Sequence, residues 1–454
     1  MYPRHNAPRH LARRALGLSL VLSIVGVTSG VGVHAAGRSA APLTLTMEDW
    51  APAAADAAIY QPCEKKLHMS IKFAFVPRTG YEAKLQTQFA AGAAPDIYDA
   101  PPEDVEYYSS KGQALDLLPY LKAMHLPYNN VPPQAQFWAG GKVGGKLLTI
   151  VQGMQSMYIF YNKDVFKQAG VAPPPHDAAH AWTWSQFVAV AKKLTVDRQG
   201  RHPGDKGFDS RHIQRYGINI PLWYAPLLPL IQSNGGSDFD KTGTHFTMNQ
   251  PAAADVIQDV ADLALKYHVM PTPSQFSSGA GSITLASGRL GMEFNGNWQV
   301  YTYGYPKSTF SWGIGVLPRF KQYRGFYFAG SGFLVSPKTA HPREAALMDY
   351  CLSYQGLSNY QTGLWVPASK NLLYGSGYRT WADNRYHPEY YRSVVVDTIK
   401  DSPTPPFNYM TQFGPLWLNQ IPPALDKIFA GQPAQTVLTQ LKPQIDAMLA
   451  SGAR

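Results

Sequence analysis

The chain has 454 residues, more than one ordinary hydrophobic core organises, so two or three globular units are expected. Hydrophobic residues make up 45% of it, which excludes a disordered chain. The formal net charge is +10, but Lys and Arg are scattered without a run of five or six, which argues against a nucleic-acid-binding protein.

The first 35 residues have the organisation of a secretory signal peptide. Four arginines precede an apolar stretch at residues 15–33, and Val33-His34-Ala35 supplies small residues before a cut after Ala35. The alternative is an uncleaved membrane anchor, because the stretch approaches the roughly 20 residues that span a bilayer. No cysteine follows it, so no lipid anchor is expected, and we expect a periplasmic or secreted protein.

Strands and helices are predicted to alternate from residue 43 onward. Alternating apolar residues predict strands at 43–47, 69–76 and 96–99, and helical spacing predicts helices at 53–67 and 81–91. A strand–helix–strand–helix–strand order predicts a parallel sheet covered by helices.

The rest of the chain continues this α/β pattern. Gly170 is expected to end a short helix, and Thr183 with Gln186 has the spacing of a capping box. Further strands are predicted at 146–151, 157–161, 290–294 and 326–336, and further helices at 163–169, 187–194, 251–267, 342–354, 416–430 and 434–450.

The cysteine content leaves two readings open. Cys63 and Cys351 are the two cysteines of the chain, and in an oxidising compartment they either pair or remain two buried thiols. No CxxC or HExxH motif occurs and the histidines lack ligand spacing, so neither a metal nor another cofactor is expected.

Six segments, taken in order, resemble one family: the extracellular solute-binding proteins of carbohydrate ABC importers, of which the maltodextrin-binding protein is the best-known member. The segments are AAGAAPDI at 90–97, MYIFYNKDVFKQAGV at 157–171, WTWSQF at 182–187, ASGRLGMEFNGNW at 286–298, WGIGVLP at 312–318 and GSGFLVSP at 330–337.

The resemblance implies a two-lobed periplasmic-binding-protein fold with a ligand cleft between the lobes. Lobe 1 would comprise residues 36–150 and 323–402, and lobe 2 residues 151–322 and 403–454. Both cysteines would then fall in lobe 1, which makes a disulfide possible. The family function implies a monomeric binder, not an enzyme, that delivers a neutral mono- or oligosaccharide to an ABC permease.

A neutral sugar is held by aromatic rings that stack on its apolar faces and by short polar side chains that match its hydroxyls. The chain has 10 Trp and 27 Tyr to draw on. By resemblance, Trp298 follows the turn where the family places a stacking ring, and Asn295 lies in that turn. Trp223 and Tyr224 precede a Gly pair that the resemblance places near the lobe 2 wall.

Further ligand contacts are expected around the lobe boundary. Gln155 stands where the family often has an acid, and this departure suits a neutral ligand. In lobe 1, the ends of the strands at 43–47 and 96–99 supply Asp49, Trp50 and Asp99, and a helix begins at Tyr81.

Three more rings complete the expected site. Tyr327 and Trp365 lie near boundaries of the cleft, and Trp417 lies near the position of a family stacking Trp. For every aromatic residue named here, the competing interpretation is packing in a hydrophobic core.

Two other classes of function remain as alternatives. A secreted polysaccharide-active enzyme needs two carboxylates about 5–10 Å apart. Glu48, Asp49, Asp99 and Glu293 are available, but no spacing singles out a pair, and no GxSxG motif occurs. The same fold also binds non-sugar solutes such as polyamines, metal chelates, phosphoesters or peptides, although the balance of aromatic and amide residues favours sugar.

Overall fold

The computed structural model describes most of the chain after residue 41. The described residues are 42–50, 60–77, 80–101, 104–128, 145–151, 153–278, 282–304, 308–329, 332–355, 360–382, 387–403, 410 and 412–451. The expected signal peptide lies outside them. Within these ranges, no helix combines the length and the apolar character needed to cross a membrane.

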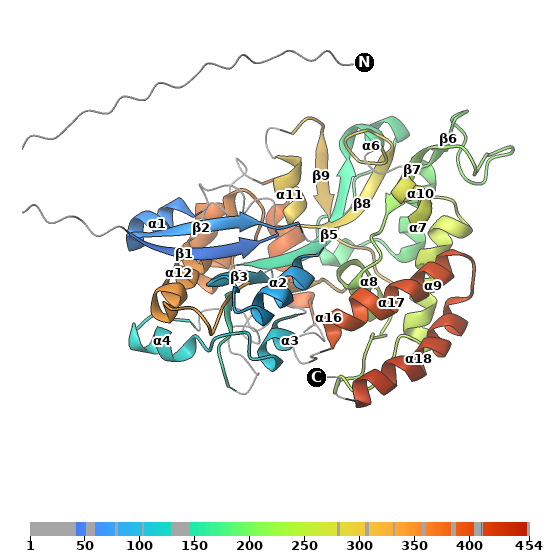
Figure 1. Ribbon diagram of the computed structural model, residues 1–454. Coiled ribbons are helices and arrows are strands. Elements are labelled where there is room, and N and C mark those ends of the chain that lie inside the picture. The colour runs from blue at the N-terminus through green and yellow to red at the C-terminus, as the bar shows by residue number, and fades with distance from the viewer. Residues whose placement is uncertain are drawn as a thin grey trace, which may run out of the picture. The chain divides into compact units, whose positions relative to one another are not determined.

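The first sheet has five strands in the order β2-β1-β3-β11-β4 (Figure 1). β1 runs parallel to β2 and β3, as the sequence predicts, while β11 is antiparallel to both β3 and β4. The sheet is therefore mixed. The strands are β1 (Leu43–Asp49), β2 (Met69–Phe75), β3 (Ile97–Ala100), β4 (Thr149–Val151) and β11 (Gly332–Val335).

The second sheet is built around β5 (Met154–Asn162), which begins shortly after β4 ends. β5 pairs antiparallel with β8, β9 and β10, and β7 runs parallel to β8. The other strands are β6 (Val196–Asp197), β7 (Ile213–Asn219), β8 (Leu290–Gly296), β9 (Trp312–Gly315) and β10 (Tyr327–Ala329).

The α-helices pack around these sheets, and α9, α17 and α18 contact one another (Figure 1). Their bounds are α1 Gln61–Leu67, α2 Tyr81–Ala90, α3 Val105–Ser110, α4 Leu118–Ala123, α6 Lys163–Ala169, α7 Trp184–Leu194, α8 Tyr224–Ser233, α9 Pro251–Leu265, α10 Pro273–Ser278, α11 Trp298–Tyr303, α12 Pro342–Gln355, α14 Lys370–Leu373, α15 Tyr378–Trp381, α16 Phe413–Pro415, α17 Ile421–Phe429 and α18 Ala434–Ala450.

Local capping signals fix the ends of α6 and α7. The Asn162 side chain accepts hydrogen bonds from the Asp164 and Val165 amides, and Gly170 ends α6 with a φ of 63°. The Thr183 and Gln186 side chains form the predicted capping box at the start of α7. These boundaries follow from short-range chemistry, which is why they are readable in the sequence.

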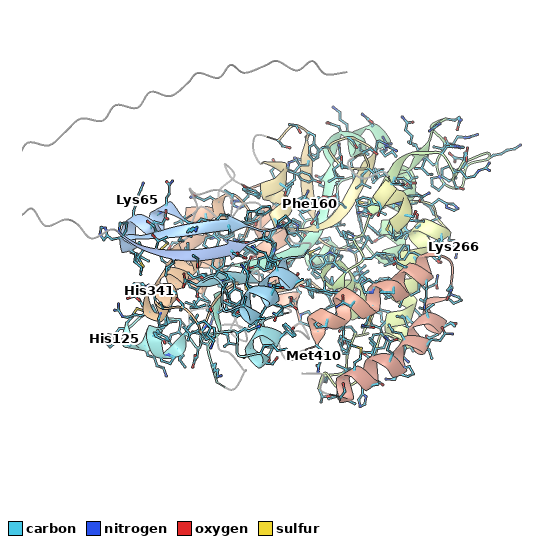
Figure 2. The ribbon with its side chains drawn as sticks, viewed as in Figure 1. Lys65, His125, Phe160, Lys266, His341 and Met410 are labelled. Carbon is cyan, nitrogen blue, oxygen red and sulfur yellow. A yellow bond between two sulfur atoms is a disulfide. The ribbon has the colours of Figure 1, made fainter. Side chains whose placement is uncertain are left out.

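Aromatic packing fills the core over the second sheet. Phe160 of β5 is fully buried, and its ring contacts Tyr158, Tyr303 and Trp312 at centroid distances of 4.9–5.9 Å. Figure 2 shows Phe160 among crowded side chains, with Lys65 and Lys266 at the outside. Many of the chain's aromatic rings therefore serve packing.

Several sequence predictions need correction. The single strand predicted at 326–336 is two strands in different sheets, β10 opposite β5 and β11 between β3 and β4. β10 thus joins the second sheet, although residues 323–402 were expected in lobe 1. The predicted helix at 416–430 opens with a π-helical turn, Leu416–Gln420. Strands β7 and β9 and helix α8 were not predicted.

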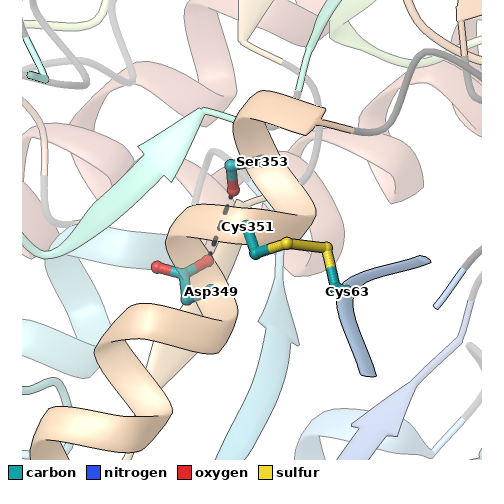
Figure 3. Close-up of a disulfide and its surroundings, with 4 residues drawn as sticks. All are labelled: Cys63, Asp349, Cys351 and Ser353. Carbon is teal, nitrogen blue, oxygen red and sulfur yellow. Dashed lines mark hydrogen bonds between the residues drawn. A yellow bond between two sulfur atoms is a disulfide. The ribbon is translucent and has the colours of Figure 1, made fainter. Parts of the chain in front are cut away.

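A disulfide joins Cys63 of α1 to Cys351 of α12, 288 residues apart in sequence (Figure 3). Both cysteines are buried. Ser353 of the same helix donates hydrogen bonds to the Ile150 carbonyl and to the buried Asp349 carboxyl, and burial raises the pKa of that carboxyl. The bond links α1 to α12, two helices that lie far apart in the sequence. Of the two readings that the sequence left open, the cysteines therefore pair and are not two free thiols.

Replacing both cysteines by serine is expected to lower the free energy of unfolding by about 2–5 kcal/mol, because the bond closes a very long loop in the unfolded chain. Urea unfolding of the parent and the double variant under non-reducing conditions measures this difference. Adding reductant to the parent provides the matched control. An unchanged midpoint in both comparisons would show that the bond contributes nothing to stability.

Candidate functional site

The carboxyl ends of β7 and β8 carry the polar side chains of a pocket of about 480 Å³. The two strands are parallel, with Asn219 opposite Glu293. Ligands of α/β sheets bind beyond the carboxyl ends of parallel strands. The lining residues are Asn219, Ile220, Pro221, Leu222, Met270, Pro271, Pro273, Phe276, Ser277, Glu293, Asn295, Pro422, Leu425 and Asp426.

Glu293 is the most perturbed carboxyl of this pocket. The Tyr303 hydroxyl donates to its Oε1 at 2.5 Å, and Asn295 Nδ2 lies 3.5 Å from the same oxygen. Burial raises the pKa of Glu293 to about 7, while these two hydrogen bonds act in the opposite direction. Asn295 is also 3.2 Å from the Gln299 amide oxygen, so the side chains on this wall hold one another in place.

Two tryptophans follow lining residues of the pocket in sequence, although neither ring is among the residues that line it. Trp223 follows the lining residue Leu222, and Trp298 opens α11 two residues after β8 ends. Their rings lie 6.0 Å apart at 47°, and both are half-buried. A Cβ on Gly296 would lie 1.9 Å from the Trp298 ring, so the glycine is what lets that ring lie against the strand end.

Other expected aromatic contacts are buried. Trp417 donates from Nε1 to Asp238 Oδ2 at 3.0 Å, and Tyr224 packs on Phe413 and Trp417. Trp365 covers Gly153, where a Cβ would lie 2.5 Å from the Trp365 Cβ. All three predicted rings are at most 4% exposed, so they act here as core residues and do not line the pocket.

The predicted residues of the first sheet gather at the ends of β1 and β3. The Tyr81 hydroxyl lies 3.2 and 3.0 Å from the carbonyl oxygens of Glu48 and Asp99, and the Trp50 ring packs edge-on against Tyr81 at 5.0 Å. Asp49 and Asp99 are both buried.

The Asp49 carboxylate accepts a hydrogen bond from the Tyr60 hydroxyl. Burial, together with the negative charges of Asp49 and Asp99, raises the pKa of Tyr60. The sequence therefore assembles this group correctly. Asp49, Tyr81 and Asp99 are buried in this group, whereas Trp50 is half-buried.

The connection between the sheets holds the remaining predicted residues. Gln155 and Tyr327 lie on the antiparallel strands β5 and β10, whose register pairs residue 155 with residue 328 and residue 156 with residue 327. The buried Asn297 side chain accepts from the Ser156 amide at 2.8 Å and donates to the Leu364 carbonyl at 2.6 Å. Asn297 thus fixes the turn before Trp298 to β5.

A second hollow of about 380 Å³ lies between α2, α3 and the C-terminal π-helical turn. Tyr107 and Glu82 line one side, and Leu418 and Asn419 line the other. Leu418 is 51% exposed, whereas its neighbour Trp417 is buried. The side chain that faces this hollow is therefore the leucine.

Of the residues that line this pocket, the sequence had indicated only Asn295 as a ligand contact, and it had not indicated Asn219, Phe276 or Asp426, among others. Glu293 was considered only as a candidate catalytic acid. The rule that ligands bind at the carboxyl ends of parallel strands identifies Asn219 and Glu293 once β7 and β8 are recognised as neighbours. Without the β7 prediction, that signal was lost.

Comparisons with known proteins identify a matching family and solved structures of the same fold. Residues 46–356 match the family model described as bacterial extracellular solute-binding protein. A curated relative, an uncharacterised lipoprotein in the oleD 5′ region of Streptomyces antibioticus, is 26% identical over 306 residues. These residues are 62% of this chain and span only 60% of that protein.

Solved structures share the fold. An ABC substrate-binding protein, Lmo0181 from Listeria monocytogenes in complex with cycloalternan, superposes with a TM-score of 0.78 at 22% identity, covering 90% of this chain and 99% of that one. The maltose/maltodextrin-binding domain MalE of Bdellovibrio bacteriovorus, bound to maltotriose, gives a TM-score of 0.68 at 18% identity, with coverages of 89% and 99%.

Replacing Glu293 by Gln is expected to stabilise the protein at pH 8 by about 1–2 kcal/mol and to have little effect near pH 4.5. The folded carboxyl has a pKa of about 7 against an ordinary value of 4.5, so the folded state binds more protons between these values. Stability of the parent therefore falls as the pH rises through this window, while Gln does not titrate. Urea unfolding at the two pH values measures the effect, and an equal difference at both would contradict it.

Proposed function

Since the chain belongs to the bacterial extracellular solute-binding protein family, and is thus an ABC substrate-binding protein and not an enzyme, we propose that its solute is a mono- or oligosaccharide. The observation that carries this proposal is the pocket at the ends of β7 and β8, which joins amide and carboxyl groups to apolar walls. The Trp223–Trp298 ring pair comes from the segments that directly follow these strands. Stacking rings with hydroxyl-matching groups are what sugar recognition requires.

The charge of the pocket supports a sugar over a phosphoester. Its polar side chains are Asn219, Ser277, Glu293, Asn295 and Asp426, and no Lys, Arg or His is among the described residues that line it. Phosphate sites use cationic side chains or helix N-termini. The sugar complexes of the Listeria and Bdellovibrio proteins lend further support.

The proposed mechanism is closure of two lobes on the ligand, followed by delivery to an ABC permease. The strands of the first sheet come from residues 43–151 and 332–335, which agrees with the expected lobe 1 at 36–150 with 323–402. The strands of the second sheet come from residues 154–329, which agrees with the expected lobe 2 at 151–322 with 403–454, except that β10 was expected in lobe 1. A ligand favours the closed state when both lobes contact it only there.

We place the protein outside the cytoplasmic membrane, exported by its first 35 residues. The Streptomyces relative is named a lipoprotein. In this chain, however, the two cysteines of the sequence form the Cys63–Cys351 disulfide, so neither thiol is available for a lipid. This supports a freely diffusing binder, and a disulfide is itself suited to an oxidising compartment.

Calorimetric titration with a panel of mono- and oligosaccharides tests the assignment. We expect a saturable one-site complex with at least one sugar, at a dissociation constant in about the micromolar range, equivalent to roughly −8 kcal/mol. If no sugar of the panel binds while peptides or amino acids do, the sugar assignment is rejected.

Replacing Trp298 by Ala is expected to weaken the sugar complex about tenfold or more, because one stacking face is lost. Trp184→Ala is the matched control, since Trp184 is also half-buried but its ring stacks on Phe320, whereas the Trp298 ring contacts Trp223. Titration of both variants with the sugar that binds the parent compares them. Equal losses in the two variants would remove Trp298 from the site.

A further inference from the structure

The pocket at the ends of β7 and β8 has an uncompensated negative character. Glu293 of β8, which is half-buried, and Asp426 of α17, which is exposed, both line it, and within the described part of the chain neither carboxyl has an ion-pair partner. Among the described residues that line the pocket, none is a Lys, Arg or His that would balance them. This matters most for Glu293, since a carboxylate that is removed from water costs free energy, which its hydrogen bonds from Tyr303 and Asn295 offset only in part.

The Asn219 amide is an independent sign of a ligand. Asn219 is 8% exposed and lines the pocket, and its side chain makes no hydrogen bond within the described residues. Buried polar groups in folded proteins are nearly always hydrogen-bonded. The Asn219 amide atoms are not among the fully buried ones, so they are open to the pocket, where a polar group of a ligand takes the place of water.

Apolar side chains strengthen charge interactions here. Leu222, Met270, Phe276 and Leu425 line the same space, so the effective dielectric constant there is lower than in water. Burial accordingly disfavours the ionised form of Glu293 in the empty protein. A positively charged ligand group would restore that ionised form, and a charge-assisted hydrogen bond is stronger than a neutral one.

We propose that the carbohydrate carries a basic amine, so that the ligand is an amino sugar or an oligosaccharide containing one, with its ammonium group between Glu293 and Asp426. This inference rests on the proposed function and goes beyond it, because the sequence resemblance implied a neutral sugar. Asn219 and Asn295 then bind ring hydroxyls, and the Trp223–Trp298 pair contacts an apolar sugar face.

Matched sugar probes test the charge directly. The disulfide-bonded mature protein is titrated calorimetrically with glucose, glucosamine and N-acetylglucosamine, with the three corresponding galactose derivatives, and with chitosan and chitin disaccharides and cellobiose. Each set keeps one skeleton and changes only the hydroxyl, amine or acetamide. We expect the amine form of at least one skeleton to bind tenfold or more tightly than both neutral forms.

The outcomes separate this inference from the proposed function. If a neutral or acetylated sugar binds as tightly as its amine counterpart, the amine proposal is overturned and the sugar assignment stands. If no sugar of either kind binds, both are rejected.

Substitution of the carboxyls locates the charge. Glu293→Gln and Asp426→Asn are each expected to lose tenfold or more in affinity for the preferred amine probe, with less than a twofold change for its hydroxyl counterpart. Asp255→Asn on the exposed face of α9 is the matched control and should leave both affinities unchanged. Retention of the parent's amine preference in both pocket variants would overturn the proposal.

Discussion

The parallel pairing of β7 with β8 is the constraint on which the candidate site depends. It sets Asn219 opposite Glu293, and it turns both strand ends toward the same edge of the second sheet. The positions of Asn219, Glu293 and Asn295 follow from this register, since a shift by one residue would turn these side chains to the other face. The antiparallel neighbour β5 pairs with β8 over five residue pairs and so holds it in place. β5 also contributes the fully buried Phe160 to the core.

Beside this edge, a glycine and an asparagine control the position of the tryptophan. Gly296 leaves room for the Trp298 ring, and Asn297 bonds the Ser156 amide and the Leu364 carbonyl. The turn is therefore anchored to two other chain segments, and the ring is presented by a rigid support. The rings of Tyr224 and Trp417 are buried, and Tyr224 links Trp417 to Trp223.

Much of the fold was readable from short-range signals, while the site depended on long-range pairing. Asn162, Gly170 and the Thr183–Gln186 box act within a few residues, and the helices they delimit were predicted correctly. Residues 326–336 look like one strand, because nothing local reveals that the chain passes between two sheets there. Trp417 was expected to face a ligand, but the π-helical turn at Leu416–Gln420 changes the helical phase and leaves Leu418 exposed instead. Asp49, Trp50, Tyr81 and Asp99 were rightly grouped, since parallel strands end at one edge, yet their burial was not visible in sequence.

The central claim is that a carbohydrate occupies the edge formed by β7 and β8 beside the paired tryptophans. Hydrogen–deuterium exchange of the mature protein, with and without the sugar that binds it most tightly, tests this claim most directly. We predict that bound sugar slows amide exchange at residues 219–223 and 293–298, with unchanged exchange in the distant α18. Protection confined to segments away from these strand ends would contradict the account.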